Sequence, residues 1–406
     1  MKKTVLWIFC LALTLLCAPA IAAQDAPSPL KIAASADLHV NPAYRTYGVV
    51  NPLEPYHLQL VDAFLWDAQE RGANVLLLLG DITNQGKRAQ HEALIEKLRK
   101  AEEGGAAVYV LPGNHDIGEV STSEFAALYA DFGYGEAFSR DGESLSYSVR
   151  LGDMLLLLLD TNGYSGHRDT AFLTDSTLRW MEGQLAIARQ KGWQVLCAGH
   201  YPLLTSNSTP FTGKEQAVRL LEDAGVPLYL CGHLHKRCVT LGDSLTELVV
   251  DQAIAYPCCY AVIESEEGGG YRYTPQPTAV SDWASKHGED DPNLLSFDAY
   301  QTQLEQTRCI DVVARLKGEQ EISAQAQRQA EDFFFKLSDY RAHGTLSRYA
   351  DMLREHPGCD ILIELGVGTI YSRWIPSVLA DAVPYTTGFV LRDGEIGALD
   401  APQAQP

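Results

Sequence analysis

Basic side chains are scarce in this sequence compared with acidic ones. It contains 32 Lys and Arg residues against 52 Asp and Glu residues, and its formal net charge is −20. Sequence-independent binding to DNA or RNA depends on clustered Lys and Arg, so this composition argues against a nucleic-acid polymer as partner. It does not exclude a small anionic substrate, because bound divalent metal ions can dominate the local field in a site.

Long apolar runs are also rare. One run, at 5–16, is too short for a comfortable membrane span, and it lies between the basic pair Lys2 and Lys3 and a group of small residues ending at Ala23. This pattern is typical of a signal peptide, assigned to residues 1–23, with an uncleaved anchor as the alternative. No second run is long enough to span a bilayer, so we expect an exported mature chain without a transmembrane segment. The sequence indicates no particular oligomeric state.

Cysteine spacing of the kind that binds zinc is absent. Cleavage of the signal peptide would remove Cys10 and Cys17 and leave an odd number of cysteines. An exported protein can form disulfides, but an odd number leaves at least one thiol without an intramolecular partner. Cys197 and Cys231 lie in apolar, strand-like runs, so we expect them to be small buried side chains.

An alternation of two patterns begins at residue 30. Short apolar runs of strand length occur at 30–34, 75–79, 108–111, 154–159, 195–198 and 228–231. Amphipathic stretches of helical length lie between them, at 56–71, 87–102, 177–191 and 214–223. The alternation predicts an α/β layered domain with a largely buried sheet, which we assign to residues 28–276.

The pattern changes after Pro277. A polar, acidic segment extends to Pro292, and long amphipathic stretches follow at 294–316, 322–340 and 345–355. Gly and Pro residues separate these stretches, as they commonly do between helices. We therefore predict a second, mainly helical domain at about 285–400.

Polar side chains follow five of the apolar runs, at the point where each run ends. They are Asp37 and His39, Asp81, the trio Asn114, His115 and Asp116, His200, and the pair His233 and His235. In open α/β sheets, binding sites form at the carboxyl ends of strands, so five strand ends can converge on one place.

These residue types suit divalent metal ions. Carboxylate and imidazole together favour manganese, iron or zinc, and no thiolate is needed. In two-metal sites the ions lie about 3.5–4 Å apart and stabilise both the attacking and the leaving oxygen, and a carboxylate can give one oxygen to each ion. The set predicts a site for two divalent or trivalent ions.

The order of the motifs resembles that of the calcineurin-like metallophosphoesterase superfamily. Its motifs run Asp-x-His, Gly-Asp, Gly-Asn-His-Asp/Glu, a lone His, and Gly-His-x-His, and residues 31–236 contain all five in this order. One motif alone would be a weak signal, but the ordered set at strand ends is specific. The resemblance implies an α/β fold, a four-layer α/β/β/α sandwich, with the mainly helical C-terminal domain appended.

The resemblance also implies a role for each residue. Asp81 would bridge two ions, with Asp37, His39 and His235 on one of them and Asn114, His200 and His233 on the other. A water activated by the metals would attack phosphorus.

Two further residues of the third motif would act without binding metal. His115 would stabilise the transition state or protonate the leaving oxygen. Asp116 could orient His115, although a structural capping role is as plausible for it. Asn84 and Gly86 fit the loop that usually follows the Gly-Asp motif.

Other polar residues near the expected site have simpler interpretations. Asp160 and Asn162 end the run at 154–159, where a strand-end turn is favoured over a role in the site. For His167 and Arg168 we favour a solvated loop over substrate contact. Tyr201 could equally line the pocket or pack in the core.

The ligands alone do not separate the members of the superfamily. The opening Asp-x-His motif and the spacing resemble the cyclic-nucleotide phosphodiesterase branch, and the helical region resembles the C-terminal domain of its exported bacterial members. We therefore expect a small phosphate-ester substrate, a phosphodiester, with cyclic nucleotides as the first hypothesis. The alternatives are a phosphomonoesterase or nucleotidase, and a non-catalytic binding protein of the cell envelope.

Overall fold

The computed structural model of the chain describes residues 30–43, 53–162, 170–266, 269–380, 382–392 and 394–399. The predicted signal peptide at 1–23 and the loop residues His167 and Arg168 lie outside these ranges. Among the described helices, none is both long and apolar enough to cross a bilayer.

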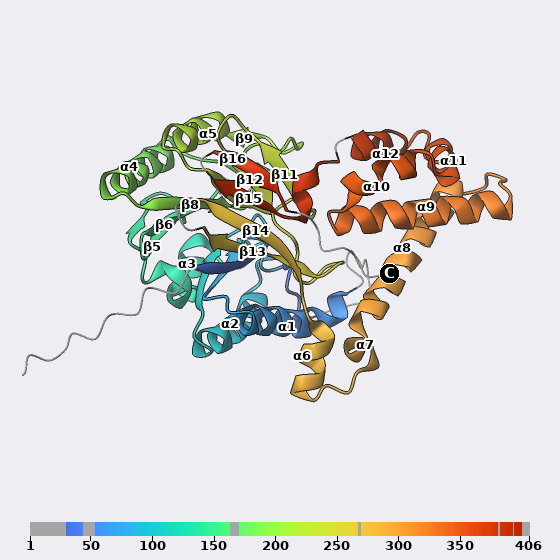
Figure 1. The fold of residues 1–406 in the computed structure, drawn as a ribbon. Helices are drawn as coiled ribbons and strands as arrows, with labels where there is room; N and C mark the ends of the chain where they lie inside the picture. Colours follow the sequence, from blue (N-terminus) through green and yellow to red (C-terminus); the bar gives the residue numbers. More distant parts are fainter. Residues whose placement is uncertain are drawn as a thin grey trace, which may run out of the picture.

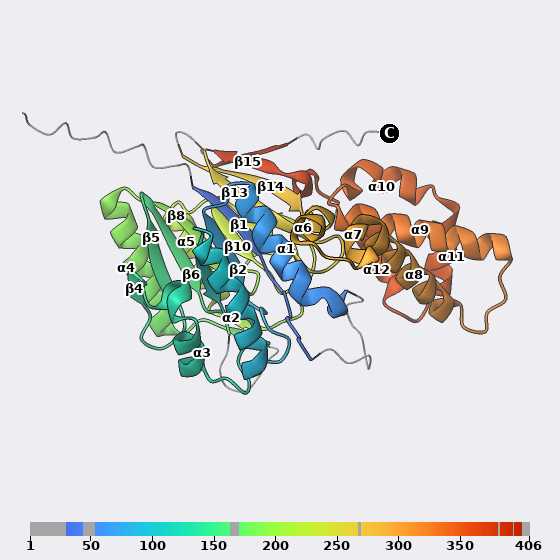
Figure 2. The same ribbon diagram turned by 90° about the horizontal axis from the view of Figure 1, so that it is seen from below.

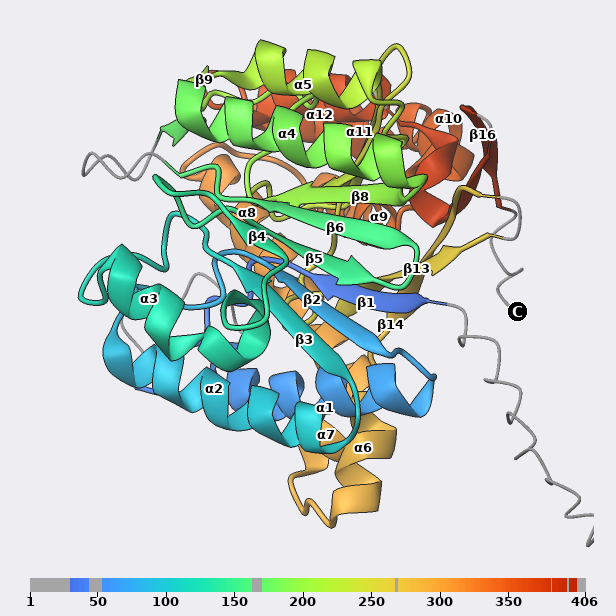
Figure 3. The same ribbon diagram turned by 90° about the vertical axis from the view of Figure 1, so that its left-hand side faces the viewer.

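Two seven-stranded sheets pack face to face in the centre of the molecule (Figure 3). The first sheet has the order β16 (Glu395–Ala398), β15 (Phe389–Arg392), β14 (Tyr271–Pro277), β13 (Cys259–Ser265), β1 (Lys31–Ser35), β2 (Val75–Leu79) and β3 (Ala107–Leu111). The second has the order β11 (Cys238–Leu241), β12 (Thr246–Val249), β10 (Leu228–Cys231), β8 (Gln194–Gly199), β6 (Met154–Leu159), β5 (Tyr147–Leu151) and β4 (Ser139–Arg140). A separate two-stranded ribbon joins β7 (Ala171–Phe172) to β9 (Phe211–Thr212).

Helices cover the outer face of each sheet. Figure 3 shows α1 (His57–Glu70) and α2 (Arg88–Glu103) along the first sheet, and α4 (Asp175–Lys191) and α5 (Lys214–Asp223) along the second. The predicted α/β/β/α layering is therefore confirmed. Every residue of β2 and β6 is buried, because each strand lies between a helical layer and the other sheet, and this explains their unbroken apolar sequences.

The strands that precede the predicted ligands run in common directions. In the first sheet, β1, β2 and β3 are parallel to one another. In the second, β6, β8, β10 and β12 are also parallel. Their carboxyl ends consequently meet at one edge of the sandwich.

In the sequence, the helical region is inserted between β14 and β15, which are neighbouring strands of the first sheet. It comprises α6 (Val280–His287), α7 (Pro292–Leu295), α8 (Phe297–Lys317), α9 (Ala324–Ala342), α10 (Leu346–Arg354), α11 (Pro357–Leu365) and α12 (Tyr371–Ala380). Figure 1 shows α9 to α12 to one side of the sheets, and Figure 2 shows α6 and α7 beside α1. Buried side chains such as Phe333 and Leu362 give this region a core of its own.

The region predicted to be mainly helical, residues 285–400, contains α7 to α12 and also two short strands near its end. Residues 389–392 and 395–398 form β15 and β16, and β15 pairs with β14 in the first sheet. These four-residue strands are too short to show a clear period in the sequence. β15 depends on a partner, β14, on the other side of the helical region, and β16 pairs with β15.

Candidate metal centre

The structure brings the first predicted ligand group together at the carboxyl ends of β1, β2 and β10. One ligand atom from each of Asp37, His39, Asp81 and His235 lies within 4.8 Å of the others. The Nε2 atoms of His39 and His235 are 3.1 Å apart, and His235 Nε2 is 3.5 Å from Asp37 Oδ1. Three imidazole or carboxylate groups beside a shared carboxylate suit a divalent cation.

The second predicted group lies on the other side of Asp81. His200 Nε2 is 3.4 Å from Asp81 Oδ2 and 3.1 Å from Asn114 Oδ1. The His233 ring centroid lies 5.3 Å from that of His200. Asp81 therefore lies between both groups, in the position that a bridging ligand requires.

The backbone at these positions adopts a conformation that is unusual for residues with a side chain. Five of the seven predicted ligands have positive φ angles, namely Asp37 (53°), His39 (45°), Asp81 (49°), His233 (68°) and His235 (48°). Such angles are uncommon outside glycine and gather at functional sites. Here they occur in the segments that directly follow β1, β2 and β10.

Hydrogen bonds to backbone carbonyls fix the orientation of the His200 and His115 rings. His200 Nδ1 donates to Leu79 O at 2.9 Å, and His115 Nδ1 donates to Asn84 O at 2.7 Å. The Nε2 atom of each ring is then left to face the site, and His115 Nε2 lies 4.0 Å from Asp81 Oδ2. An outer hydrogen bond of this kind commonly orients a metal-binding histidine.

The electrostatics of the site fit metal binding. Burial lowers the pKa of His39 and of His233 to about 3, so both rings are neutral near pH 7, the form that binds a metal. Burial also opposes ionisation of Asp81, but the surrounding His200, His39 and His115 rings outweigh it and hold its pKa well below its usual range. Burial raises the pKa of Asp37, a cost that a bound cation would remove. The donor set thus fits two cations.

Asp116 does not orient His115, contrary to one of the two interpretations of the sequence. Its carboxylate is fully buried and accepts hydrogen bonds from the backbone N–H groups of Thr83 (2.8 Å), Gly113 (2.8 Å) and Ile82 (3.2 Å), and from the Thr83 hydroxyl. It joins the loop after β2 to the loop after β3, while the Asn84 carbonyl orients His115.

The remaining predicted residues support the site without facing it directly. Asp160 Oδ1 accepts from Asn162 N at 3.1 Å, as expected of a strand-end turn, and Asn162 Nδ2 donates to Pro112 O at 2.8 Å. Tyr201 is buried, and its ring centroid lies 4.1 Å from that of His233. Tyr201 therefore packs in the core and also packs against His233, a predicted ligand.

Three residues around the site were missed in the sequence. Gln252 Nε2 donates to Asp37 O at 3.0 Å. Thr209 Oγ1 lies 3.2 Å from His233 Nε2. The Glu247 carboxylate accepts from three consecutive backbone N–H groups, at 203–205, just after His200. Only Gln252 carried a signal, because it follows an apolar run at 248–250 as the predicted ligands follow theirs.

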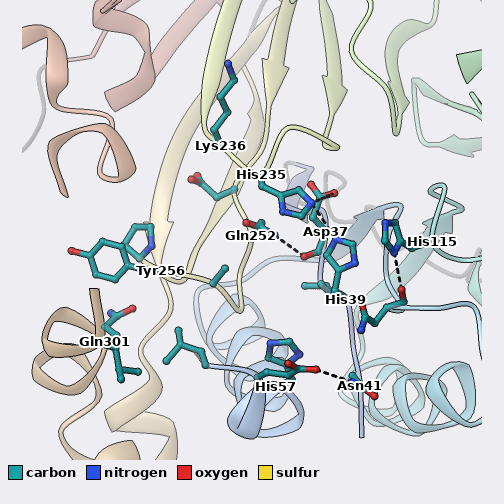
Figure 4. Close-up of a pocket in the computed structure, with 18 of the residues that line it drawn as sticks. Asp37, His39, Asn41, His57, His115, His235, Lys236, Gln252, Tyr256 and Gln301 are labelled. Carbon is teal, nitrogen blue, oxygen red and sulfur yellow. Dashed lines mark hydrogen bonds and ion pairs between the residues drawn. The ribbon is translucent and has the colours of Figure 1, made fainter. Parts of the chain in front are cut away.

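A pocket of about 1060 Å³ opens from the centre toward the helical region. Asp37, His39, His115 and His235 line one side of it. Figure 4 shows Tyr256 and Gln301 across the pocket from His115. Gln301 belongs to α8, so the helical region supplies part of the wall.

These observations define a four-layer α/β/β/α protein with a two-metal type of site at its strand ends. The chain belongs to the calcineurin-like phosphoesterase family, whose model matches residues 30–237. This confirms the family resemblance of the motifs.

Comparisons with known proteins agree with this family. The human serine/threonine-protein phosphatase CPPED1 is 26% identical over 193 residues, which cover 44% of this chain and 58% of that protein. The chain thus spans little more than half the length of that relative. A probable glycerophosphodiester phosphodiesterase, GpdQ from Arcobacter nitrofigilis, is 22% identical over 53% of this chain and 75% of its own length. Among solved structures, a dimetal phosphatase from Danio rerio shares the fold, with a TM-score of 0.50 and 14% identity over 62% of this chain and 97% of that chain.

Proposed function

We propose that this protein hydrolyses phosphate esters with two metal ions held by the seven predicted ligands. The observation that carries the proposal is the position of Asp81 between two ligand groups, beside a pocket that His115 also lines. When bound, the two ions supply Lewis acidity and an activated water. His115, fixed through Nδ1, directs Nε2 at the site, where it can stabilise or protonate an ester oxygen.

The substrate we propose is a small phosphodiester, with cyclic nucleotides as the first class to test. The wall supplied by α8 and α9 supports a small molecule, because a pocket bounded on that side suits a compact ligand better than an extended one. The relative whose printed name is a glycerophosphodiester phosphodiesterase supports a diester.

A phosphomonoester is the second candidate. Several relatives are named as phosphatases, among them the human tartrate-resistant acid phosphatase type 5, which is 31% identical over 31% of this chain and 42% of that protein. Those names support monoester hydrolysis by the same ligand set.

The test is a substrate panel with the purified protein loaded with manganese, iron or zinc. It should contain a linear diester, a 3′,5′-cyclic nucleotide and a monoester. Turnover of a diester above the monoester supports the first candidate, and the reverse order supports the second. Bound metal without turnover of any ester would contradict the enzyme proposal and favour a binding protein.

Two variants separate metal binding from chemistry. Asp81→Ala should lose both bound metal and turnover, because it removes the residue shared by the two ligand groups. His115→Ala should keep its metals and lose activity about 10²–10⁴-fold, the usual range for a general acid. Asp243→Ala, in an exposed loop, is the matched control. Full activity of the His115 variant would refute its assigned role.

We also propose that the protein is exported after cleavage of the segment at 1–23, which lies outside the described residues. N-terminal sequencing of the protein recovered outside the cytoplasm should then give a start near Ala23 or Gln24. Recovery of the chain with Met1 still present would contradict cleavage.

A further inference from the structure

The wall of the pocket that faces the metal centre is built by the helical region. Seven residues of this wall come from α8 and α9, namely Gln301, Leu304, Glu305, Arg308, Ser338, Arg341 and Ala342. The family model ends before this region. What this wall binds must therefore be inferred from its own side chains.

Arg341 is a guanidinium in this wall without a carboxylate partner among the described residues. It lies over the Trp374 ring, 5.6 Å from its centroid, and burial lowers its pKa. The other two arginines of the pocket are paired. Arg308 forms two hydrogen bonds with Glu305, at 2.7 and 2.5 Å, and Arg237 forms two with Asp251, at 3.0 and 2.8 Å.

This wall consequently carries one positive charge in excess. Glu305 offsets Arg308, so Arg341 is left, in a protein whose formal net charge is −20. A partly buried cation without a counter-ion is unfavourable unless an anion joins it. The same position would attract a negatively charged part of a ligand.

The side-chain oxygen of Gln301 is a second polar group in this wall, and it lacks a partner among the described residues. Gln301 is 7% exposed, and its Oε1 has no hydrogen-bond partner in the described part of the chain. Its Nε2 donates to Asp298 Oδ1 at 3.2 Å, so a flipped amide would place its oxygen against that carboxylate. Oε1 therefore offers an acceptor to a hydroxyl or N–H group in the pocket (Figure 4).

We propose that Arg341 and Gln301 form a specificity subsite for the part of the substrate that is not being hydrolysed. The ligand class is a small organic phosphate ester that carries a hydrogen-bond donor and a second anionic group. This inference rests on the proposed function, because it places the ester phosphate at the metal centre. It favours linear esters over cyclic mononucleotides, which carry a single anionic phosphate.

Binding to the metal-loaded full-length protein tests the subsite without turnover. The probes are methylphosphonate and a series of ω-phosphonocarboxylates of increasing length: phosphonoacetate, 3-phosphonopropanoate and 4-phosphonobutanoate. Titration calorimetry should show at least one bis-anion binding about 10- to 100-fold more tightly than methylphosphonate, the range expected for a hydrogen bond to a charged group. Arg341→Gln should remove that gain and leave methylphosphonate affinity unchanged.

The matched control is Arg328→Ala, an exposed arginine on the same helix that should keep the full gain. The assignment of Arg341 would be overturned if no phosphonocarboxylate of any length bound more tightly than methylphosphonate. It would also be overturned if Arg341→Gln kept the tighter binding. For Gln301, the affinity of 2-hydroxy-3-phosphonopropanoate is compared with that of 3-phosphonopropanoate, which lacks the hydroxyl. Gln301→Leu should lose the preference for the hydroxyl, and an unchanged preference would remove Gln301 from the subsite.

Kinetics distinguish failure of the subsite from failure of the proposed function. The test uses a pair of 4-nitrophenyl aryl phosphodiesters. The two esters differ only in whether the second ring carries a carboxylate or a carboxamide. The enzyme should prefer the carboxylate about tenfold in kcat/KM, and Arg341→Gln should abolish this preference without slowing the carboxamide. A third diester with a phosphonate at that position shows which anion is preferred. If neither ester of the pair is hydrolysed, the proposed function fails; if both are hydrolysed equally, only the subsite fails.

Discussion

At the scale of single residues, the predicted ligands depend on the absence of side chains beside them. Gly113 precedes Asn114, and a Cβ atom there would lie 2.2 Å from both the backbone nitrogen and Oδ1 of Asp81. At Gly80, which has a φ of 80°, a Cβ would lie 2.7 Å from His200 Nδ1. These glycines let two strand ends approach closely enough for their side chains to share one ion.

We predict that Gly113→Ala displaces Asp81 and weakens metal binding by at least about tenfold, since outer contacts of metal ligands commonly contribute 10–100-fold. Metal titration followed by elemental analysis measures the effect. Gly142→Ala is the control, because a Cβ there would meet no atom within 4 Å. Metal content equal to that of wild type in Gly113→Ala would show that the loops can separate without losing the site.

At the scale of elements, a carboxylate on one strand holds the loop that follows another. Glu247 on β12 is fully buried and accepts from the backbone N–H groups of Leu203, Leu204 (2.7 Å) and Thr205 (2.7 Å), in the loop after β8. That loop begins at His200. The pairing of β10 with both β8 and β12 brings the carboxylate beside it.

We predict that Glu247→Gln lowers the free energy of unfolding by about 1–3 kcal/mol, because the amide can no longer accept at both positions and leaves a buried N–H without a partner. Urea denaturation measures the loss. Glu264→Gln, on β13 and partly exposed beside Lys31, should change stability by about 1 kcal/mol or less. Equal losses in the two variants would contradict the role given to Glu247.

The end of α9 carries a pair whose charge depends on pH. His343 Nδ1 lies 3.2 Å from Asp339 Oδ1, and Tyr256 donates to the same carboxylate. Burial and the nearby Arg237 lower the pKa of His343, but Asp339 outweighs them and raises it overall. Burial opposes ionisation of Asp339, but its bonds to His343 and Tyr256 lower its pKa.

The signs of these shifts fix the pH window of the pair. The contribution of His343 is complete below its unfolded pKa of about 6.5 and is lost as pH rises through the higher folded value. The contribution of Asp339 is present above its unfolded pKa of about 3.9 and is lost as pH falls below the folded value. The pair therefore stabilises the protein most between about pH 4 and 6.5.

We predict that His343→Gln lowers the free energy of unfolding by about 0.2–1 kcal/mol at pH 6, a value reduced because the ring is 43% exposed. The difference from wild type should shrink by pH 8.5. Urea denaturation across this range measures it, and a cycle with Asp339→Asn isolates the pair. A difference that grows with pH would show that the sign of the shift is wrong.

At the scale of the whole molecule, one arginine joins the metal-binding domain to the helical region. Arg237 follows His235, is 8% exposed, and pairs with Asp251 through Nε. Its Nη1 donates to His343 O at 2.9 Å, at the end of α9. The pocket lies between the parts that this residue connects, so its shape depends on the connection.

We predict that Arg237→Ala lowers the free energy of unfolding by about 3–5 kcal/mol, because it leaves Asp251 buried without its partner. The helical region should also become more sensitive to limited proteolysis. Chemical denaturation and timed trypsin digestion, with Arg328→Ala as the exposed control, measure both effects. A loss below about 1 kcal/mol would mean that other contacts hold the two parts together.

The parts of the fold that were predictable are those whose signal lies within one element. β2 and β6 occur where the sequence has unbroken apolar runs, since strands buried on both faces have no polar side to display. β15 and β16 gave no such signal, because these short strands are defined by pairing, of β15 with β14 and of β16 with β15, rather than by their own residues.

The sequence by itself determined the order of the motifs and their positions at strand ends, and therefore the family and the candidate ligands. These features are local, since a strand, a turn and the polar residue after it are adjacent in the chain. Only the tertiary structure decided what each polar group contacts. Asp116 bonds to backbone N–H groups rather than to His115, and Gln252 supports Asp37 from the segment after β12. Arg341 and Gln301 reach the pocket only because the helical region folds back over it, and no local pattern encodes that packing.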